Sequence, residues 1–198
     1  MRQETRNIYQ FSELSPEAQE YAIEHEREHI AYNGEITWQG EIFDSFKAVF
    51  ETAGITIKDY SLSMEAYRNN LKIRFNNEEA EGLNGPRAMA WLENNLFSKL
   101  RMPWQGKRRN DTRKYGKAYW PNYIPPCPLT GYCADENYLD ELKKDIKSGM
   151  TLKDSFMDMV NVYSRLVENE YEYQTSDEGI KETIEANESE FDENGHMI

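Results

Sequence analysis

The sequence predicts an α+β fold that is rich in helices and has a small antiparallel sheet. Six segments have the capping residues or the apolar spacing of helices, and three others alternate apolar and polar residues as strands do. The chain has 198 residues, which is long enough to bury a core without disulfides. Its mean hydropathy of −0.88 is low, but aromatic residues make up 13% of the chain and each ring buries a large area.

The first quarter of the chain predicts a strand and two helices. Residues 7–11 alternate and contain β-forming residues, which predicts a short strand. Ser15 is a favoured N-cap and a proline follows it at the first helical position, so we expect a helix over residues 16–31. A second helix is expected over about residues 35–52, with Gly54 ending it.

The middle of the chain predicts two antiparallel strands and a helix. The strands are expected at residues 55–62 and 67–75. In the second of them apolar residues alternate with Lys and Arg, which is typical of a sheet with one face in water. Residues 86–100 follow a Gly-containing turn and place leucines on one stripe, which predicts a helix.

The last third of the chain predicts a linker, three helices and a hairpin. Residues 121–128 are rich in proline, which predicts an extended linker and a division of the chain into residues 1–120 and 121–198. The helices are expected at residues 135–148, 151–170 and 176–188. The Asn194-Gly195 pair predicts a hairpin turn near the end of the chain.

Charge is unevenly distributed along the sequence. Residues 99–117 hold eight of the 23 Lys and Arg residues and one acid, giving +7, whereas residues 1–98 carry −8 and residues 118–198 carry −12. The total of −13 argues against general nucleic-acid binding, which needs a positive face. It favours a basic partner or high solubility.

The basic segment, residues 99–123, combines cations with aromatic rings. The cations could contact phosphates while the rings stack on bases. The residues expected to make such contacts are Trp104, Lys107, Arg108, Arg109, Arg113, Lys114 and Trp120. The alternative is that this segment docks on the acidic parts of the same chain or on an acidic partner, which a net charge of −13 favours.

The C-terminal region is strongly acidic. Residues 168–193 contain eleven Asp and Glu residues against Lys181 alone. Carboxylates spaced along a rigid surface can imitate nucleic-acid phosphates and block the basic cleft of a nucleic-acid-binding enzyme. The acidic contact face predicted here consists of Glu178, Glu182, Glu185, Glu188 and Asp192. The alternative is an ordinary solvated helix face.

Residues 25–29 satisfy the H-E-x-x-H pattern of zinc hydrolases. On a helix His25 and His29 are one turn apart and could share a zinc ion, with Glu26 polarising its bound water. The two positions between them are charged here, although in metalloproteases they pack inside the protein, and nothing marks a third ligand. We therefore expect these histidines at the edge of a core, and we predict neither a metal nor another cofactor.

The two cysteines, Cys127 and Cys133, predict neither a disulfide scaffold nor a zinc site. Two are too few for a scaffold, and the five residues between them exceed the usual spacing of a zinc-binding pair. We expect small buried apolar side chains.

Several other classes of protein are disfavoured. The sequence has no P-loop, no G-x-S-x-G and no G-x-G-x-x-G, so nothing nominates an enzyme. The sequence contains no run of 18 apolar residues, so it predicts no membrane span. The N-terminal residues lack the apolar core of a signal peptide. We therefore expect a cytoplasmic protein without membrane contact.

Three stretches resemble a family of small bacteriophage proteins labelled "antitoxin of toxin–antitoxin stability system". They are IYQFSELSPEAQEYAI at residues 8–23, CPLTGYCADENYLDEL at residues 127–142 and EYEYQTSDEGIKETIEANESEFDENG at residues 170–195. In that family an I-Y-x-F-x-E-L-S start precedes an amphipathic helix, and a Y-E-Y-x-x-S-D-E tail closes the chain. Because the family motif marks both ends, the resemblance implies that the N-terminal strand lies near the C-terminal hairpin.

The resemblance also implies a phage accessory protein that acts in a bacterial cytoplasm. Such proteins commonly bind and disable host defence systems. The function expected is therefore non-enzymatic inhibition of a host defence or nucleic-acid-processing protein through an acidic, DNA-like surface. One alternative is an antitoxin-like or nucleic-acid-associated protein that uses residues 99–117. A metal hydrolase built on His25, Glu26 and His29 is the remaining alternative.

Overall fold

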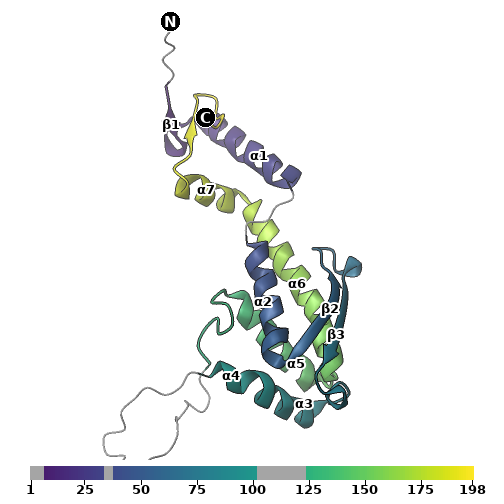
Figure 1. Cartoon of the computed structure of the whole chain (residues 1–198). Coiled ribbons are helices and arrows are strands. Elements are labelled where there is room, and N and C mark those ends of the chain that lie inside the picture. Colours follow the sequence, from purple (N-terminus) through teal and green to yellow (C-terminus); the bar gives the residue numbers. More distant parts are fainter. Residues whose placement is uncertain (1–6, 34–37, 102–123) are drawn as a thin grey trace, which may run out of the picture. The chain divides into compact units, whose positions relative to one another are not determined.

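The computed structural model describes residues 7–33, 38–101 and 124–198, and it confirms a helix-rich α+β fold (Figure 1). It is 64% helical, and the strands form two small antiparallel sheets. The helices are α1 (Pro16–Asn33), α2 (Gln39–Ala53), α3 (Gly85–Leu92), α4 (Ser98–Leu100), α5 (Ala134–Ser148), α6 (Leu152–Gln174) and α7 (Asp177–Ala186). The strands are β1 (Tyr9–Gln10), β2 (Ile55–Ser61), β3 (Asn70–Phe75) and β4 (Glu190–Phe191). None of the helices described is long and apolar enough to cross a membrane.

The expected helices and strands are found, with differences at their ends. The helix expected over residues 86–100 is divided into α3, a π-helical turn at Glu93–Phe97 and α4. Strand β3 begins at Asn70 because Ala66–Arg68 forms a 3-10 turn just before it. Helix α7 ends earlier than expected because Glu188 has a φ of 51°, which no α-helix accommodates.

The chain forms two compact units. Unit 1 comprises residues 1–39 and 167–198, and unit 2 comprises residues 40–166. Helix α6 belongs to unit 2 up to Leu166 and to unit 1 from Val167. The expected division between residues 120 and 121 lies outside the described residues, and the two compact units divide the chain at other places.

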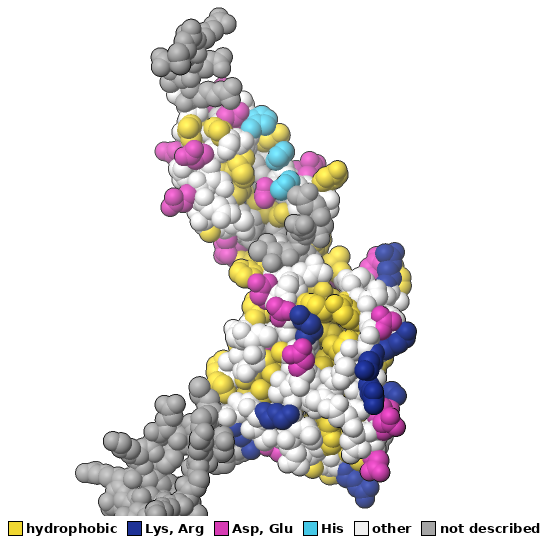
Figure 2. Space-filling view, viewed as in Figure 1, with side chains coloured by type: hydrophobic (Ala, Val, Ile, Leu, Met, Phe, Trp, Pro, Cys, Tyr) yellow, Lys and Arg dark blue, Asp and Glu magenta, His cyan; other side chains and the backbone are white. Residues whose placement is uncertain are grey.

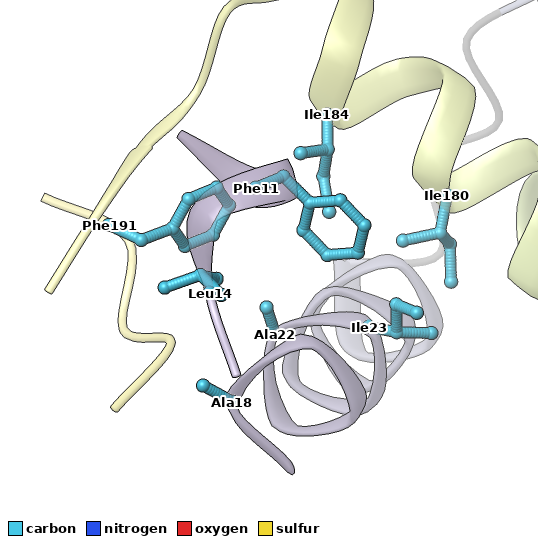
Figure 3. Close-up of a cluster of buried hydrophobic side chains, with 8 residues drawn as sticks. All are labelled: Phe11, Leu14, Ala18, Ala22, Ile23, Ile180, Ile184 and Phe191. Atoms are coloured by element: carbon cyan, nitrogen blue, oxygen red, sulfur yellow. The ribbon is translucent and has the colours of Figure 1, made fainter. Parts of the chain in front are cut away.

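Unit 1 has a small apolar core to which both ends of the chain contribute (Figure 3). Its buried side chains are Phe11, Leu14, Ala18, Ala22, Ile23, Ile180, Ile184 and Phe191. They come from the turn after β1, from α1, from α7 and from β4, and the rings of Phe11 and Phe191 lie 6.1 Å apart. Removing these side chains from water is what holds the two distant segments together.

A sheet joins the same two segments. Tyr9 of β1 pairs antiparallel with Phe191 of β4, and Phe191 in turn forms a bridge with Met197. The N-terminal strand therefore lies beside the C-terminal hairpin, as expected. The hairpin turn includes Gly195, whose φ of +87° favours glycine, and a Cβ atom there would lie 2.2 Å from the backbone oxygen of Ala18.

Unit 2 is organised around aromatic side chains. Its largest buried residues include Phe46 and Phe50 of α2, Phe75 of β3, Tyr138 of α5 and Phe156 of α6. The Phe156 ring lies 5.3 Å from that of Phe50 and 5.9 Å from that of Phe75. Strands β2 and β3 pair antiparallel, with a bulge between residues 57 and 59. These rings compensate for the low apolar content of the chain.

Two buried aspartates of α5 differ in their hydrogen bonding. Asp135 is fully buried, and its carboxylate accepts bonds from the backbone N–H groups of Leu129 and Thr130, each at 2.8 Å, and from the Thr130 hydroxyl at 3.0 Å. Asp145 is only 6% exposed, yet its Oδ2 atom has no hydrogen-bond partner among the described residues. Asp135 thus stabilises the loop before α5. The carboxylate of Asp145 loses its hydration on burial, and its Oδ2 atom gains no hydrogen bond in return.

Candidate interaction surface

The predicted acidic face lies on the outer side of α7. Ile180 and Ile184 are buried against α1, so the other side of the helix faces solvent. The side chains of Glu178, Glu182 and Glu185 are all exposed there. Ser176 fixes the start of the helix because its Oγ atom accepts a hydrogen bond from the Gly179 N–H at 3.1 Å.

Two other residues predicted for this face are placed differently. Glu188 lies beyond the end of α7 and is exposed. Asp192 stabilises the terminal hairpin, because its Oδ1 atom accepts hydrogen bonds from the N–H groups of Asn194 at 2.9 Å and His196 at 3.0 Å. The backbone hydrogen bond from His196, more than any other contact, lowers the pKa of Asp192 below its ordinary value. Asp192 therefore holds the backbone of the terminal hairpin in place.

A second acidic stripe runs along α1. It consists of Glu17, Glu20, Glu24 and Glu28, all of which are exposed. Their spacing of three, four and four residues places them on one side of the helix, with about one turn between neighbours. This face was missed in the sequence analysis, although the helical spacing of the four glutamates was visible there.

The fold gathers negative charge in unit 1. This unit contains four Lys and Arg residues and 19 Asp and Glu residues, which gives a formal charge of −15. Unit 2 contains 19 Lys and Arg residues and 17 Asp and Glu residues, which gives a formal charge of +2. Figure 2 shows acidic side chains over the described part of unit 1, which is the part containing α1 and α7. Counting charge along the sequence hid this segregation, because unit 1 combines residues from both ends.

Arg27 and Lys181 are the basic residues of unit 1 that the structure describes. Arg27 donates from Nε to the backbone oxygen of Thr175 at 2.9 Å and pairs with the carboxylates of Glu24 and Asp177. Its charge is therefore used to tie α1 to the start of α7. Lys181 is exposed and leaves the surrounding carboxylates in large excess.

The histidines of the H-E-x-x-H pattern lie on the surface of α1. Ala18 and Ala22 of the same helix are buried, but His25 and His29 are exposed. No group of three metal-ligating side chains is found in the described residues. Figure 2 shows the three histidines of the chain on one face of unit 1.

Tyr21 connects these surface rings. Its ring stacks on His25 with centroids 6.0 Å apart and meets His196 of the terminal hairpin at 4.8 Å. Next to His196 is an open hollow of about 460 Å³, whose lining includes Tyr9, Glu193 and Met197. Unit 1 thus presents a continuous surface from the α1 rings to the hairpin.

Other predicted site residues lie apart from this surface or outside the described chain. Cys127 is half-buried and Cys133 is exposed, so the expectation of buried cysteines is wrong for Cys133, and both thiols are free. The contacts predicted for Trp104, Lys107, Arg108, Arg109, Arg113, Lys114 and Trp120 fall outside the described residues. Two nearby cations have partners within the chain: Lys99 Nζ donates to the Thr52 backbone oxygen at 2.5 Å, and Arg101 pairs with Glu93 at 2.5 Å.

Comparisons with known proteins do not place the chain in a family. No family model, no curated protein and no solved structure matches it.

Proposed function

We propose that this chain is a phage accessory protein that binds a bacterial host protein through the acidic surface of unit 1. The partner is a defence or nucleic-acid-processing protein with a basic cleft, and binding inhibits it without catalysis. The proposed setting is the bacterial cytoplasm. The phage origin rests on the resemblance of residues 8–23, 127–142 and 170–195 to a phage protein family, and the mode of binding rests on charge.

The observation that carries the proposal is the charge of −15 confined to unit 1. Nine of its 19 Asp and Glu residues lie on two helices, α1 and α7, which pack on one core. Glutamates one helical turn apart are separated by about 5–6 Å along the axis, so each helix offers a regular row of negative charge. A rigid row of anions is what a nucleic-acid-binding cleft recognises in the phosphate backbone.

The alternative function uses the basic segment to bind nucleic acid. Most of that segment lies outside the described residues, and the two cations described, Lys99 and Arg101, contact the chain itself. These contacts agree better with docking of basic residues on the protein than with a free nucleic-acid site. A metal hydrolase receives no support from the exposed positions of His25 and His29.

The proposal is tested by capture of the partner from a lysate of the bacterial host, followed by displacement with DNA. We expect a nucleic-acid-binding protein that a double-stranded DNA fragment releases in a concentration-dependent manner. The purified pair is then measured by calorimetry with a triple variant, Glu178→Gln, Glu182→Gln and Glu185→Gln. Losing three charges at about 0.5 kcal/mol each should weaken binding about tenfold at moderate salt.

A matched control removes the same charge from unit 2. Glu78→Gln, Glu79→Gln and Glu136→Gln change three exposed carboxylates there and should leave the affinity unchanged. Glutamine at position 182 keeps an oxygen that can accept the hydrogen bond from the Tyr173 hydroxyl. Equal loss in both triple variants, a partner that DNA does not displace, or recovery of nucleic acid alone would contradict the proposal.

A further inference from the structure

The outer face of α1 carries aromatic rings beside its acidic stripe. At about 100° per residue, Tyr21, His25, Glu28 and Tyr32 lie within about 60° of one another around the helix axis. Tyr21 is 43% exposed and Tyr32 is 90% exposed. These two exposed rings lie beside the glutamates of α1, so this face offers aromatic and negatively charged groups together.

This combination of groups has a specific chemical complement. A guanidinium group stacks on an aromatic ring and also pairs with a carboxylate through two parallel hydrogen bonds. An ammonium group is a compact, strongly hydrated charge and gains less from the ring. A face with glutamates alone attracts both Lys and Arg, and aromatic rings beside the glutamates strengthen the preference for Arg.

We infer that the face of unit 1 formed by Tyr21, His25, Tyr32 and the neighbouring glutamates of α1 is a docking surface for a partner protein that presents arginine side chains. The inference rests on the proposed function and makes it more specific. The charge of −15 in unit 1 supplies the complementarity, and the rings supply the preference for arginine.

The surface continues to the terminal hairpin. The contact between Tyr21 and His196, at 4.8 Å, leads to the hollow of about 460 Å³ beside Glu193 and Met197. This hollow combines a carboxylate with apolar surface, which suits the charged head and the methylene stem of a long cationic side chain. Arginine side chains of one partner can therefore occupy both the helix face and the hollow.

The test compares two peptides of equal charge, octa-arginine and octa-lysine, each labelled with a fluorophore. Binding to the full chain is measured by fluorescence anisotropy at about 150 mM salt, where surface charges are partly screened. We expect octa-arginine to bind at least about two- to fivefold more tightly, because each stacked guanidinium adds a cation–π contact at an exposed site.

Variants separate the rings from the charge. Tyr32→Ala, at a position that is 90% exposed, should leave the fold intact and reduce the preference for arginine. The double variant Tyr21→Ala, Tyr32→Ala should abolish it, while Tyr21→Phe, Tyr32→Phe should retain it because the rings remain. Glu17→Gln with Glu28→Gln should weaken the binding of both peptides, because both are cations. Circular dichroism verifies that each variant is folded.

The outcomes distinguish this inference from the proposed function. Equal binding of the two peptides, or an arginine preference that persists without both tyrosines, overturns the inference. An arginine preference that depends on the tyrosines supports it, even if the captured partner is not displaced by DNA and the proposed function fails. Loss of partner binding in the α7 triple variant without any arginine preference supports the proposed function alone.

Discussion

Asp145 gives a prediction whose size can be calculated from the structure. Its side chain is only 6% exposed, and its Oδ2 atom has no hydrogen-bond partner among the described residues. The pKa of Asp145 is raised to about 6, mainly by burial and to a smaller extent by the negative charges of Asp158 on α6 and Glu141 on α5. Lys144 acts in the opposite direction. The ionised carboxylate therefore destabilises unit 2.

The pH dependence follows from the difference between the folded and unfolded states. The unfolded side chain has a pKa of 3.8, so between that value and about 6 the folded state binds more protons. Proton binding by Asp145 stabilises the folded state. This stabilisation is complete below pH 3.8 and is lost as the pH rises through about 6. The pKa difference between the two states corresponds to a contribution of about 3 kcal/mol to the free energy of unfolding, of which roughly 1 kcal/mol should be lost between pH 5.3 and pH 8.

The variant Asp145→Asn removes the titration and keeps the size of the side chain. Its amide group can also donate a hydrogen bond to a neighbouring carboxylate. Urea unfolding of the wild type and of the variant should be measured at pH 5.3 and pH 8, both above the isoelectric point of 4.8. Trp91 packs against Phe75 and Phe156, so the change in its fluorescence reports on unit 2, and Trp38→Phe removes the tryptophan signal of unit 1 in both proteins.

We expect the free energy of unfolding of the wild type to fall by about 1 kcal/mol more than that of Asp145→Asn over this pH range. Glu136→Gln, which changes an exposed carboxylate of the same helix, should behave as the wild type does. If Asp145→Asn retains the full pH dependence of the wild type, burial of an unpaired carboxylate is not its cause and the reasoning is refuted.

Two further predictions concern the elements that hold each unit together. Gly195→Ala should destabilise unit 1 by at least about 2 kcal/mol, because φ is +87° and the new Cβ would lie 2.2 Å from the Ala18 oxygen. Gly131→Ala has a similar φ of +90° but open space around it, so thermal unfolding of both variants separates the clash from the backbone cost. Asp135→Ala should lower the urea stability of unit 2 by about 3 kcal/mol, since the N–H groups of Leu129 and Thr130 lose their acceptor. A loss in Asp135→Ala no larger than that in Glu136→Gln would show that the loop does not depend on these bonds.

Local signals predicted the secondary structure well. The Ser15-Pro16 start of α1 and the Asn194-Gly195 turn depend on neighbouring residues only, so they were visible in the sequence. The π-helical turn at Glu93–Phe97 was not, because the apolar spacing through residues 86–100 is that of an ordinary helix. The end of α7 was also placed too late, since nothing in the sequence marked the positive φ of Glu188.

The candidate surface was only partly predictable, because unit 1 depends on contacts between residues far apart in the chain. Glu178, Glu182 and Glu185 were identified from helical spacing alone, and the same rule would have found the stripe on α1. The contact of Arg27 with the Thr175 oxygen joins residues separated by 148 positions, and no local pattern predicts it. The contact between Tyr21 and His196 is of the same kind, so the ring surface emerged only from the fold.

The composition of unit 1 has a consequence for the order of folding during synthesis. Residues 40–166 complete unit 2 before the second half of unit 1 has been made. About 160 residues separate the end of α1 from Phe191, and at translation rates of about 5–20 residues per second this corresponds to roughly 8–32 s. During that time the apolar side of α1 has no α7 or β4 to cover it. The core of unit 1 can therefore be completed only after Phe191 has been made.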